Sequence, residues 1–381
     1  MPFTILHFSD LHLDAAFAGS RLPAEIARQC REQLRSTLRA IVDLARQRQV
    51  NAVTIAGDLF EREKLNPDTA AFLAQECERL APIPVYIAPG NHDAADAASL
   101  YQRGRWPENV RIAVSHALSE WRLTGPYSLW SAAHLSPSDR HNFLSGFVMP
   151  AGASGRLPIL LLHASLAPAN FEGSRSHAPL TLNDIRGAGF ALALLGHYHT
   201  RKVVQEEGVL AVYSGSPEPL GFQEPGEHGV TLVHLEAAQK PVLEFIALAR
   251  LHFATLELSV TGCRHRDQLI ERILVLAGEG QYRDKLVRLR LTGEAAASLR
   301  LELEAITRRV EKSFGFLYLE NDTRPAIDLS TLASEPTVRG AFIRDMLAAL
   351  EQAQEAEQRA LYQEALDYGM QAFEHDDITL R

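Results

Sequence analysis

The chain has 381 residues, a length that suggests two or three domains. Apolar residues make up 46% and charged residues 22%, the balance of a globular protein that buries a core. The formal net charge of −9 argues against a surface coated with basic groups for nucleic acid, although a local basic groove is compatible with it. The sequence contains no run of about 18 apolar residues, which argues against a membrane-spanning helix.

The N-terminus and the cysteines predict a cytoplasmic protein. The segment MPFTILHFSDLHLD lacks the basic region and the small-residue cleavage site of a secretory signal. Cys30, Cys77 and Cys263 match neither a disulfide framework nor a zinc-ribbon spacing. We expect three reduced, mostly buried thiols.

In chain order, the first part of the sequence predicts strands that alternate with helices. Apolar positions recur at helical spacing over residues 23–49 and 68–80. The predicted strands are 4–9, 52–57, 84–89, 110–114, 127–133, 157–163, 190–197, 209–214 and 229–236, with the last two in a hairpin-like region. This alternation predicts an α/β fold with a central sheet and helices outside it.

The character of the chain changes near residues 248–251. The segment ATLELSV (254–260) alternates between apolar and polar side chains, and a β-α-β-α-β pattern follows as far as residue 320. Residues 336–375 predict helical structure with an apolar stripe of Val338, Phe342, Met346 and Leu350. We therefore expect a first domain at 1–250, a small α+β domain at 251–330 and a C-terminal helical segment at 331–381. The helical stripe would either pack on its own domain or bind a partner.

Metal-competent side chains follow five of the predicted strands, at the point where each strand ends. They are Asp10 and His12 in SDLH, Asp58 in GD, Asn91 with His92 and Asp93 in GNHD, His163, and His197 with His199 in GHYH. Ligands bind at this edge of open α/β sheets, so we expect these side chains to meet there. Each motif alone is a weak signal, and a single His after a strand is more often a surface or capping residue. The joint order, one motif after each apolar strand, is a strong signal.

The types of side chain indicate two hard or borderline divalent ions. Carboxylate, amide and imidazole ligands without a thiolate suit Mn²⁺, Fe²⁺ or Zn²⁺. Asp10, His12, Asp58, Asn91, His163, His197 and His199 are too many ligands for one tetrahedral site, so two adjacent ions sharing one carboxylate are expected. Such a pair is the usual apparatus for displacement at phosphorus.

The spacing within the motifs supports this interpretation. Residues i and i+2 of an extended chain point the same way, so Asp10 and His12 could reach one centre, as could His197 and His199. Gly57, Gly90 and Gly196 stand beside ligands, where the chain must turn sharply and admit a substrate. Tyr198 is expected to pack or to line the groove. The remaining histidines, among them His7, His116, His134, His141, His177, His228, His252 and His375, are interpreted as structural or solvated.

The motifs SDLHLD, GDLF, GNHD, a lone His and GHYH resemble the calcineurin-like metallophosphoesterase superfamily over roughly residues 3–235. SDLHLD, SGSPEPLGFQE (214–224) and the α+β unit that follows are most similar to the SbcD-type DNA repair nucleases, including the YhaO-like subgroup. The resemblance implies an α/β fold: a metallophosphoesterase β-sandwich flanked by helices, a small α+β capping domain that helps engage DNA, and a C-terminal helical segment.

By position, the resemblance implies a role for each site residue. One metal would be held by Asp10, His12, Asp58 and His199, and the other by Asp58, Asn91, His163 and His197, with Asp58 bridging. A metal-bound hydroxide would be the nucleophile. His92 would be catalytic without binding metal, and Asp93 would either orient it or cap a turn. Some nuclease relatives carry a His where this chain has Glu61, which could still hydrogen-bond His92 and raise its pKa.

Three functions follow as alternatives. The first is a DNA exonuclease or endonuclease in DNA repair. The second is a phosphodiesterase or phosphatase with a substrate other than DNA. The third is a mainly architectural subunit whose C-terminal helices bind an SMC-like coiled-coil ATPase of the SbcC type. The resemblance also implies a possible homodimer. Arg288 and Arg290, on the polar face of the strand 285–291, could contact phosphates or be merely solvated.

Overall fold

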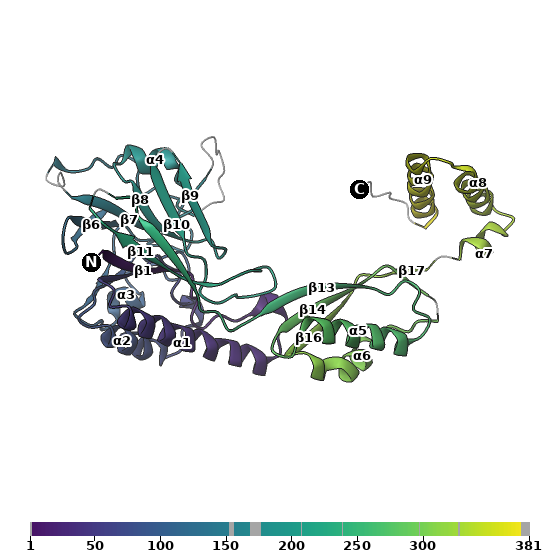
Figure 1. Ribbon diagram of the computed structural model, residues 1–381, viewed down its shortest axis with the longest axis horizontal. Coiled ribbons are helices and arrows are strands. Elements are labelled where there is room, and N and C mark those ends of the chain that lie inside the picture. The colour runs from purple at the N-terminus through teal and green to yellow at the C-terminus, as the bar shows by residue number, and fades with distance from the viewer. Residues whose placement is uncertain are drawn as a thin grey trace. The chain divides into compact units, whose positions relative to one another are not determined.

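The computed structural model describes residues 2–151, 156–167, 177–206, 208–237, 239–296, 298–326 and 328–374 (Figure 1). Its contacts define two compact units. The first comprises Met1–Leu256, Ile273–Arg290 and Thr307–Glu320, and the second comprises Glu257–Arg272, Leu291–Ile306 and Asn321–Arg381. The predicted domain boundaries at residues 250 and 330 stay predictions.

Two six-stranded sheets form the centre of the first unit. The order of the first is β12-β11-β1-β2-β3-β4, with β1 at Phe3–Phe8, β2 at Ala52–Ile55, β3 at Val85–Ile87, β4 at Val110–Ile112, β11 at Gly229–Leu235 and β12 at Val242–Ala247. The order of the second is β5-β6-β7-β8-β10-β9, with β5 at Ser119–Arg122, β6 at Tyr127–Ser131, β7 at Leu157–His163, β8 at Leu192–Gly196, β9 at Lys202–Glu206 and β10 at Val209–Tyr213. Both sheets are mixed, which confirms the α/β sandwich.

The strands that carry the predicted ligands are parallel neighbours. Strands β1, β2, β3 and β4 run parallel in one sheet, and β6, β7, β8 and β10 run parallel in the other. Phe8 pairs with Ile55 and Ile55 with Ile87, so the chain leaves these strands at one level. His163 pairs with Gly196 in the second sheet. The carboxyl ends of both parallel sets are thereby brought together.

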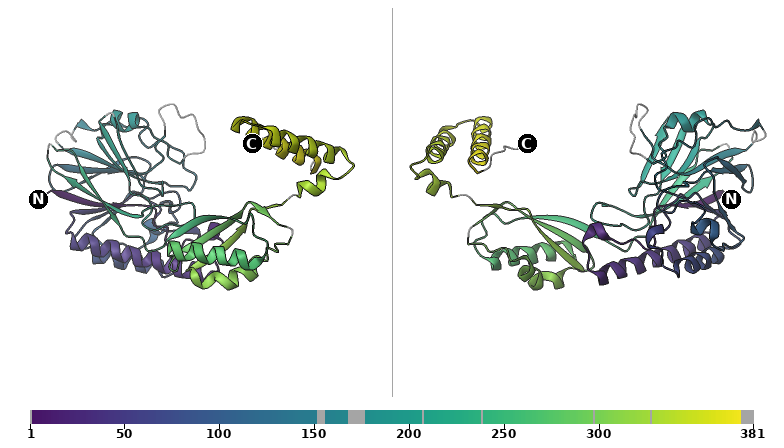
Figure 2. Two further views of the ribbon diagram at one scale, coloured as in Figure 1. Left: turned by 45° about the vertical axis from the view of Figure 1, so that its right-hand side comes forward. Right: turned by 180° about the vertical axis from the view of Figure 1, so that it is seen from behind.

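Apolar side chains fill three layers around the sheets. Ile5, Leu161, Leu194 and Val212 are fully buried between the two sheets. One outer layer packs helices α1 (Ala24–Gln47) and α2 (Thr69–Arg79) on the first sheet, and Figures 1 and 2 show them covering its outer face. The other packs α4 (Leu182–Gly187) on the second sheet. Because a fully buried Leu or Val contributes roughly 1.5–3 kcal/mol, these layers hold the strand ends in place.

The rest of the chain forms smaller elements. Strands β13 (Phe253–Ser259), β14 (Leu286–Thr292) and β16 (Phe316–Asn321) make a sheet in the order β13-β14-β16, with helices α5 (Arg266–Gly280) and α6 (Leu303–Val310) between them in sequence. Strands β15 (Glu294–Ala295) and β17 (Arg324–Pro325) pair in parallel. Along β13, exposed and partly buried residues alternate as predicted. The short remaining helices are α3 (Leu100–Arg103), η1 (Ala18–Ser20), η2 (Arg62–Lys64) and η4 (Glu311–Ser313).

The C-terminal segment consists of α7 (Leu329–Ala333), α8 (Val338–Gln352) and α9 (Ala356–Glu374). Ile343, Leu366 and Met370 are buried between α8 and α9, and Phe342, Met346 and Leu350 of the predicted stripe pack against them. Val338 departs from the stripe because it is 79% exposed. Most of the stripe therefore packs within its own segment. Residues 375–381, including His375, lie outside the described part of the chain.

Two details of the strands differ from the sequence prediction. Strands β10 and β11 are not a hairpin, because β10 pairs with β8 and β9 while β11 pairs with β1 and β12 of the other sheet. The partners β9 and β12 were not predicted, since charged and polar residues interrupt their apolar pattern. Cys30, Cys77 and Cys263 are buried and free, as predicted. Among the described helices, none is long and apolar enough to cross a bilayer.

Candidate metal centre

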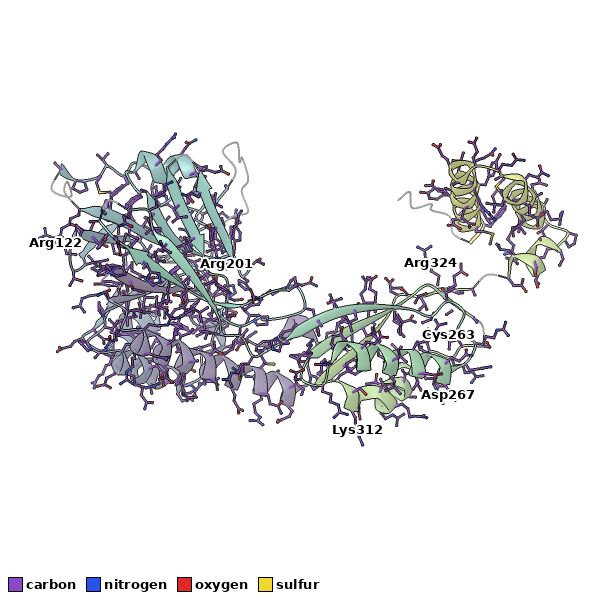
Figure 3. The ribbon with its side chains drawn as sticks, viewed as in Figure 1. Arg122, Arg201, Cys263, Asp267, Lys312 and Arg324 are labelled. Carbon is purple, nitrogen blue, oxygen red and sulfur yellow. The ribbon has the colours of Figure 1, made fainter. Side chains whose placement is uncertain are left out.

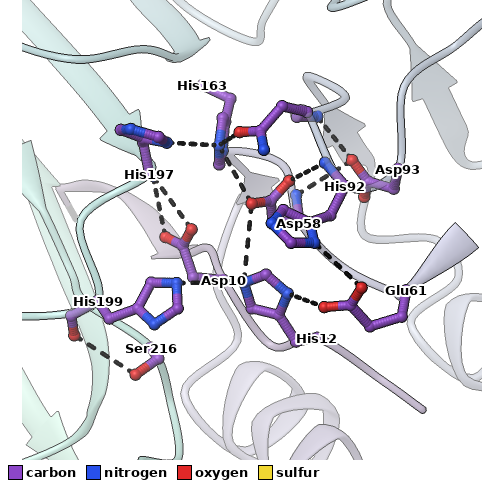
Figure 4. Close-up of polar contacts among 12 residues, drawn as sticks. Asp10, His12, Asp58, Glu61, His92, Asp93, His163, His197, His199 and Ser216 are labelled. Carbon is purple, nitrogen blue, oxygen red and sulfur yellow. Dashed lines mark hydrogen bonds and ion pairs between the residues drawn. The ribbon is translucent and has the colours of Figure 1, made fainter. Parts of the chain in front are cut away.

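The loops that follow β1, β2, β3, β7 and β8 converge on one point (Figure 4). All seven predicted ligands lie there: Asp10, His12, Asp58, Asn91, His163, His197 and His199. The carboxylates Asp10 and Asp58 are 0% and 2% exposed, and His12 and His163 are 2% and 1% exposed. Such burial of charged groups is costly unless opposite charge is supplied nearby.

The backbone at this point is held in an unusual conformation. Asp10, His12 and Asp58 have φ values of 57°, 49° and 51°, in the left-handed region that residues with a Cβ seldom adopt. The prediction that Asp10 and His12 meet because they lie on an extended chain was therefore wrong in its reason. The chain leaves β1 and turns, and both side chains still reach the same group. Strain of this kind gathers at functional sites.

Glycines allow the ligand loops to touch. A Cβ on Gly90 would lie 2.3 Å from the Asp58 Oδ1 atom, and one on Gly196 would lie 1.9 Å from the Ala56 carbonyl oxygen. Both distances are shorter than a non-bonded contact permits. These glycines let the neighbouring loops pack against each other, and the predicted close approach of a substrate stays a prediction.

The first group of ligands consists of Asp10, His12 and His199. The Nδ1 atom of His12 lies 2.8 Å from the Glu61 carboxylate, and the Nδ1 atom of His199 lies 2.7 Å from the Glu224 carboxylate. In the tautomer whose Nδ1–H donates to the carboxylate, each neutral ring has its lone pair on Nε2 and can bind an ion there. These Nε2 atoms face each other at 3.2 Å, an arrangement that a cation between them would stabilise.

The second group surrounds His163. The Nδ1–H of His163 donates to the Ala56 carbonyl at 2.8 Å, so its Nε2 atom points inward. That Nε2 atom lies 3.0 Å from the Asn91 Oδ1 atom, 3.3 Å from the Asp58 Oδ2 atom and 3.3 Å from the His197 Nδ1 atom. Burial by itself would lower the pKa of His163, but the Asp58 carboxylate raises it to about 9. The pocket therefore favours positive charge at this position.

Asp58 stands between the two groups. Its Oδ2 atom is 3.3 Å from the His163 Nε2 atom and 3.7 Å from the His12 Nε2 atom. The donors are oxygen and nitrogen atoms without a thiolate. Asp10, His12 and His199 form one set that could hold an ion, and Asp10, Asp58 and His163 form another, so Asp10 belongs to both sets and Asp58 lies within 3.7 Å of a histidine from each. The residues present therefore fit two adjacent divalent ions.

His92 lies beside these groups and is 45% exposed, unlike the buried ligands Asp10, His12, Asp58 and His163. Its ring Nδ1 atom is 3.0 Å from the Glu61 Oε2 atom, while the Oε1 atom of the same carboxylate holds His12. The hydrogen bond to Glu61, followed by the charge of Asp58, raises the pKa of His92 to about 9. The predicted contact between Glu61 and His92 is confirmed, and its effect on the pKa has the predicted direction.

Asp93 is fully buried and contacts backbone rather than the ring of His92. Its carboxylate accepts hydrogen bonds from the amides of Asp58, Leu59 and Gly90 at 3.1, 2.7 and 2.6 Å, and from the Tyr101 hydroxyl at 2.6 Å. These contacts tie the Asp58 loop to the GNHD loop. The geometry favours a structural task for Asp93, and its predicted catalytic role stays a prediction.

Glu224 is the residue that the sequence prediction missed. It belongs to the SGSPEPLGFQE stretch (214–224), where the sequence predicts no site residue. Its Oε1 atom holds His199, and its Oε2 atom accepts hydrogen bonds from the Ser216 hydroxyl and the Leu220 amide at 3.2 and 3.0 Å. A signal was present, because carboxylates commonly orient ligating histidines, but residues 199 and 224 are too far apart in sequence for spacing to reveal the pair.

The comparison with known families agrees with this geometry. A family model described as calcineurin-like phosphoesterase matches residues 3–208, more than half of the chain. The chain belongs to the calcineurin-like phosphoesterase family.

The chain is similar to several individual proteins. The chain is 30% identical over 243 residues to an uncharacterised metallophosphoesterase, YhaO, of Bacillus subtilis, which covers 61% of this chain and 57% of the relative. It is 29% identical over 243 residues to the DNA double-strand break repair protein Mre11 of Sulfurisphaera tokodaii, and this alignment covers 60% of this chain and 59% of the relative. The chain thus spans about three fifths of the length of these relatives. A solved structure, TT1561 of Thermus thermophilus, aligns at 16% identity over 64% of this chain and 99% of the other, with a TM-score of 0.38.

Proposed function

We propose that this phosphoesterase is a DNA nuclease, an exonuclease or endonuclease that hydrolyses phosphodiester bonds with two divalent metal ions. The observation that carries the dinuclear proposal is the Asp58 Oδ2 atom, which lies within 3.7 Å of imidazole nitrogens from both ligand groups. A carboxylate in that place can hold two ions next to each other, and paired ions are suited to displacement at phosphorus.

The ligands divide between the ions as follows. Asp10, His12, Asp58 and His199 would hold one, and Asp58, Asn91, His163 and His197 the other. Mn²⁺ is the expected metal, with Fe²⁺ or Zn²⁺ as alternatives, because the donors are imidazole and oxygen. When bound, the ions would neutralise phosphate charge and activate a water molecule.

His92 would act on the substrate directly. With its pKa raised to about 9, the ring is protonated at neutral pH and can donate a proton from Nε2 to the leaving oxygen. Glu61 fixes the ring through Nδ1, so that the Nε2–H points away from Glu61. Because the same carboxylate holds His12, Glu61 sets the proton donor and a metal ligand in one arrangement. Glu61 is thus a positioning residue.

Support for DNA as the substrate comes from the relatives rather than from the metal centre. The similarity to Mre11, whose name records a role in double-strand break repair, favours a DNA repair nuclease of the SbcD type. On this proposal residues 1–250 are catalytic, 251–330 form a cap that engages DNA, and 331–381 bind an SMC-like ATPase of the SbcC type. A homodimer and a cytoplasmic location belong to the same proposal.

One assay separates the alternatives. Purified protein with Mn²⁺ is given linear double-stranded DNA and, separately, bis-nitrophenyl phosphate. The DNA nuclease proposal predicts hydrolysis of both, with both activities lost in Asp58→Ala and in His92→Ala. Hydrolysis of the small ester without DNA cleavage would point to another phosphodiester or phosphomonoester substrate. Inactivity on both, together with tight association with an ATPase, would point to the architectural role.

A further inference from the structure

A groove leads away from the metal centre on the side of His197 and His199. It has a volume of about 620 Å³ and is lined by His197, Tyr198, His199, Thr200, Arg201, Lys202, Gln223 and Glu224. This volume lies within the range of about 300–1,000 Å³ that is usual for ligand sites. His197 and His199, which line the groove, are predicted metal ligands. A molecule in the groove would therefore lie next to the reacting phosphate.

The groove contains two cations that aromatic rings hold in place. The guanidinium of Arg201 lies over the Phe245 ring at 4.9 Å from the centroid, and the Nζ atom of Lys202 lies 5.8 Å from the Tyr198 centroid. An aromatic face orders a cationic side chain without neutralising its charge. Both side chains are exposed, and within the described part of the chain neither forms an ion pair. Their charge is therefore available to an anion.

Other cations that the sequence suggested for DNA are engaged within the chain. The Arg288 guanidinium lies over the Phe222 ring at 5.3 Å and donates to the Thr255 hydroxyl at 3.2 Å, and Arg290 lies 3.6 Å from Glu320. Near the metal centre, Arg62 is paired with Asp96. Arg201 and Lys202 are thus better placed than these to meet phosphate beside the predicted ions.

We propose that the groove of Tyr198, Arg201 and Lys202 is a binding subsite for the sugar–phosphate backbone of the DNA strand next to the scissile bond. This inference rests on the nuclease function proposed above and specifies where its substrate lies. In a protein of net charge −9, a polyanion needs such local cations to approach. Lys202 lies over Tyr198 of the groove, whereas the adjacent Arg201 lies over Phe245, which does not line the groove. The two cations therefore have different neighbours, and two separate cations suit successive phosphates of a strand better than a single phosphate group.

The test measures DNA binding as a function of salt. The protein used is the full chain with His92→Gln. Because His92 is half-exposed and is not a predicted ligand, this substitution should slow DNA cleavage and leave the predicted ligands intact. Binding of a fluorescent single-stranded oligonucleotide is followed by anisotropy between about 50 and 200 mM salt. Arg201→Gln and Lys202→Gln should each weaken binding about tenfold at low salt and reduce the slope of log K against log salt by about 0.7, and the double variant by about 1.4.

Arg122→Gln is the matched control. Arg122 is an exposed arginine on β5, the edge strand opposite to β9 in the same sheet (Figure 3). The Arg122→Gln variant should have the same DNA affinity and the same slope of log K against log salt as the parent protein, which carries only His92→Gln. Hydrolysis of bis-nitrophenyl phosphate in the His92-containing proteins adds a second readout, since the groove variants should lose more activity on DNA than on this small ester.

Two results would overturn the inference, and they are distinguishable. If the double variant has the same slope and affinity as Arg122→Gln while the parent binds DNA, the subsite is wrong and the nuclease proposal stands. If the parent does not bind DNA, the DNA proposal itself fails, and the subsite fails with it.

Discussion

At the scale of single residues, the centre is organised by two carboxylates that lie outside the predicted ligand set. Glu61 and Glu224 each hold the Nδ1 atom of a predicted ligand and so direct its Nε2 atom inward. The second ligand group has no such carboxylate on His163, whose Nδ1 atom is held by a neutral carbonyl. The group of Asp10, His12 and His199 therefore has the more negative surroundings.

Glu224→Gln tests this orienting role. An amide holds His199 less firmly and removes a negative charge near the ion, so metal affinity should fall about 10–100-fold. Calorimetric titration of the metal-free protein with Mn²⁺ measures the change. Glu227→Gln, an exposed glutamate three residues away, is the control and should bind metal as the wild type does. Equal affinity in the two variants would show that Glu224 does not support the site.

Glu61→Gln tests the proton donor. Because the raised pKa of His92 depends first on Glu61, activity should persist in the wild type until the pH approaches about 9. In the variant the alkaline limb should move toward about 6.5, the ordinary value for histidine. The rate of hydrolysis of bis-nitrophenyl phosphate against pH measures this, with metal content recorded because Glu61 also holds His12. An unchanged alkaline limb in the metal-loaded variant would show that His92 is not the proton donor. Glu63→Gln, a substitution of an exposed glutamate, serves as the control and should leave the pH profile unchanged.

At the scale of elements, buried polar residues join parts that are distant in sequence. The His7 ring on β1 lies between Thr54 of its own sheet, at 3.1 Å, and the Leu195 carbonyl of the other sheet, at 3.2 Å. Glu218 accepts hydrogen bonds from Thr37 of α1 and from the amides of Arg250 and Leu251 at 2.6, 3.0 and 2.9 Å. It thereby fixes the point where the chain leaves the sandwich.

His7 predicts a loss of stability in acid. Burial lowers its pKa to about 4, below the ordinary 6.5, so the folded state binds its proton less readily than the unfolded state. The corresponding stability is present above pH 6.5 and is lost as the pH falls toward 4, by about 2 kcal/mol between pH 7 and pH 5. Urea unfolding at both pH values measures it. In His7→Gln this part of the pH dependence should be missing, and an identical acid loss in both proteins would contradict the assignment.

Glu218 predicts a large cost of substitution. Removing its carboxylate in Glu218→Ala leaves the donors of Thr37, Arg250 and Leu251 without their acceptor, which should lower the free energy of unfolding by about 3 kcal/mol or more. Glu218→Gln retains one oxygen and should cost less. Urea denaturation compares them, and a loss below about 1 kcal/mol in the alanine variant would show that water replaces these bonds.

How far the sequence predicts the structure differs between these elements. The strand at 157–163 was placed to the residue, because a continuous apolar run between Pro and Gly signals has few alternatives. The pairing of β10 and β11 with different sheets was not predictable, since periodicity carries no information about partners. The ligands were predicted because they follow apolar strands, whereas Glu224 and the left-handed backbone of Asp10 depend on contacts that only folding creates.

At the scale of the whole molecule, the buried ionisable side chains of the metal centre lie together near one edge of the sandwich. A chain of net charge −9 gathers buried carboxylates and imidazoles there and places exposed Arg201 and Lys202 in the groove beside them. Bound metal ions would therefore serve two purposes, to compensate buried negative charge and to receive phosphate. Removal of metal by a chelator should both abolish hydrolysis and lower the melting temperature, because an ion that binds only the folded state stabilises it.

In the proposed centre, Asp58 joins two metal ions. Crystals grown with Mn²⁺ and measured for anomalous scattering test it most directly. We predict two peaks about 3.5–4 Å apart with the Asp58 carboxylate between them, the first beside His12 and His199 and the second beside Asn91, His163 and His197. A single peak, or a peak held by Glu61 and His92, would contradict the dinuclear centre.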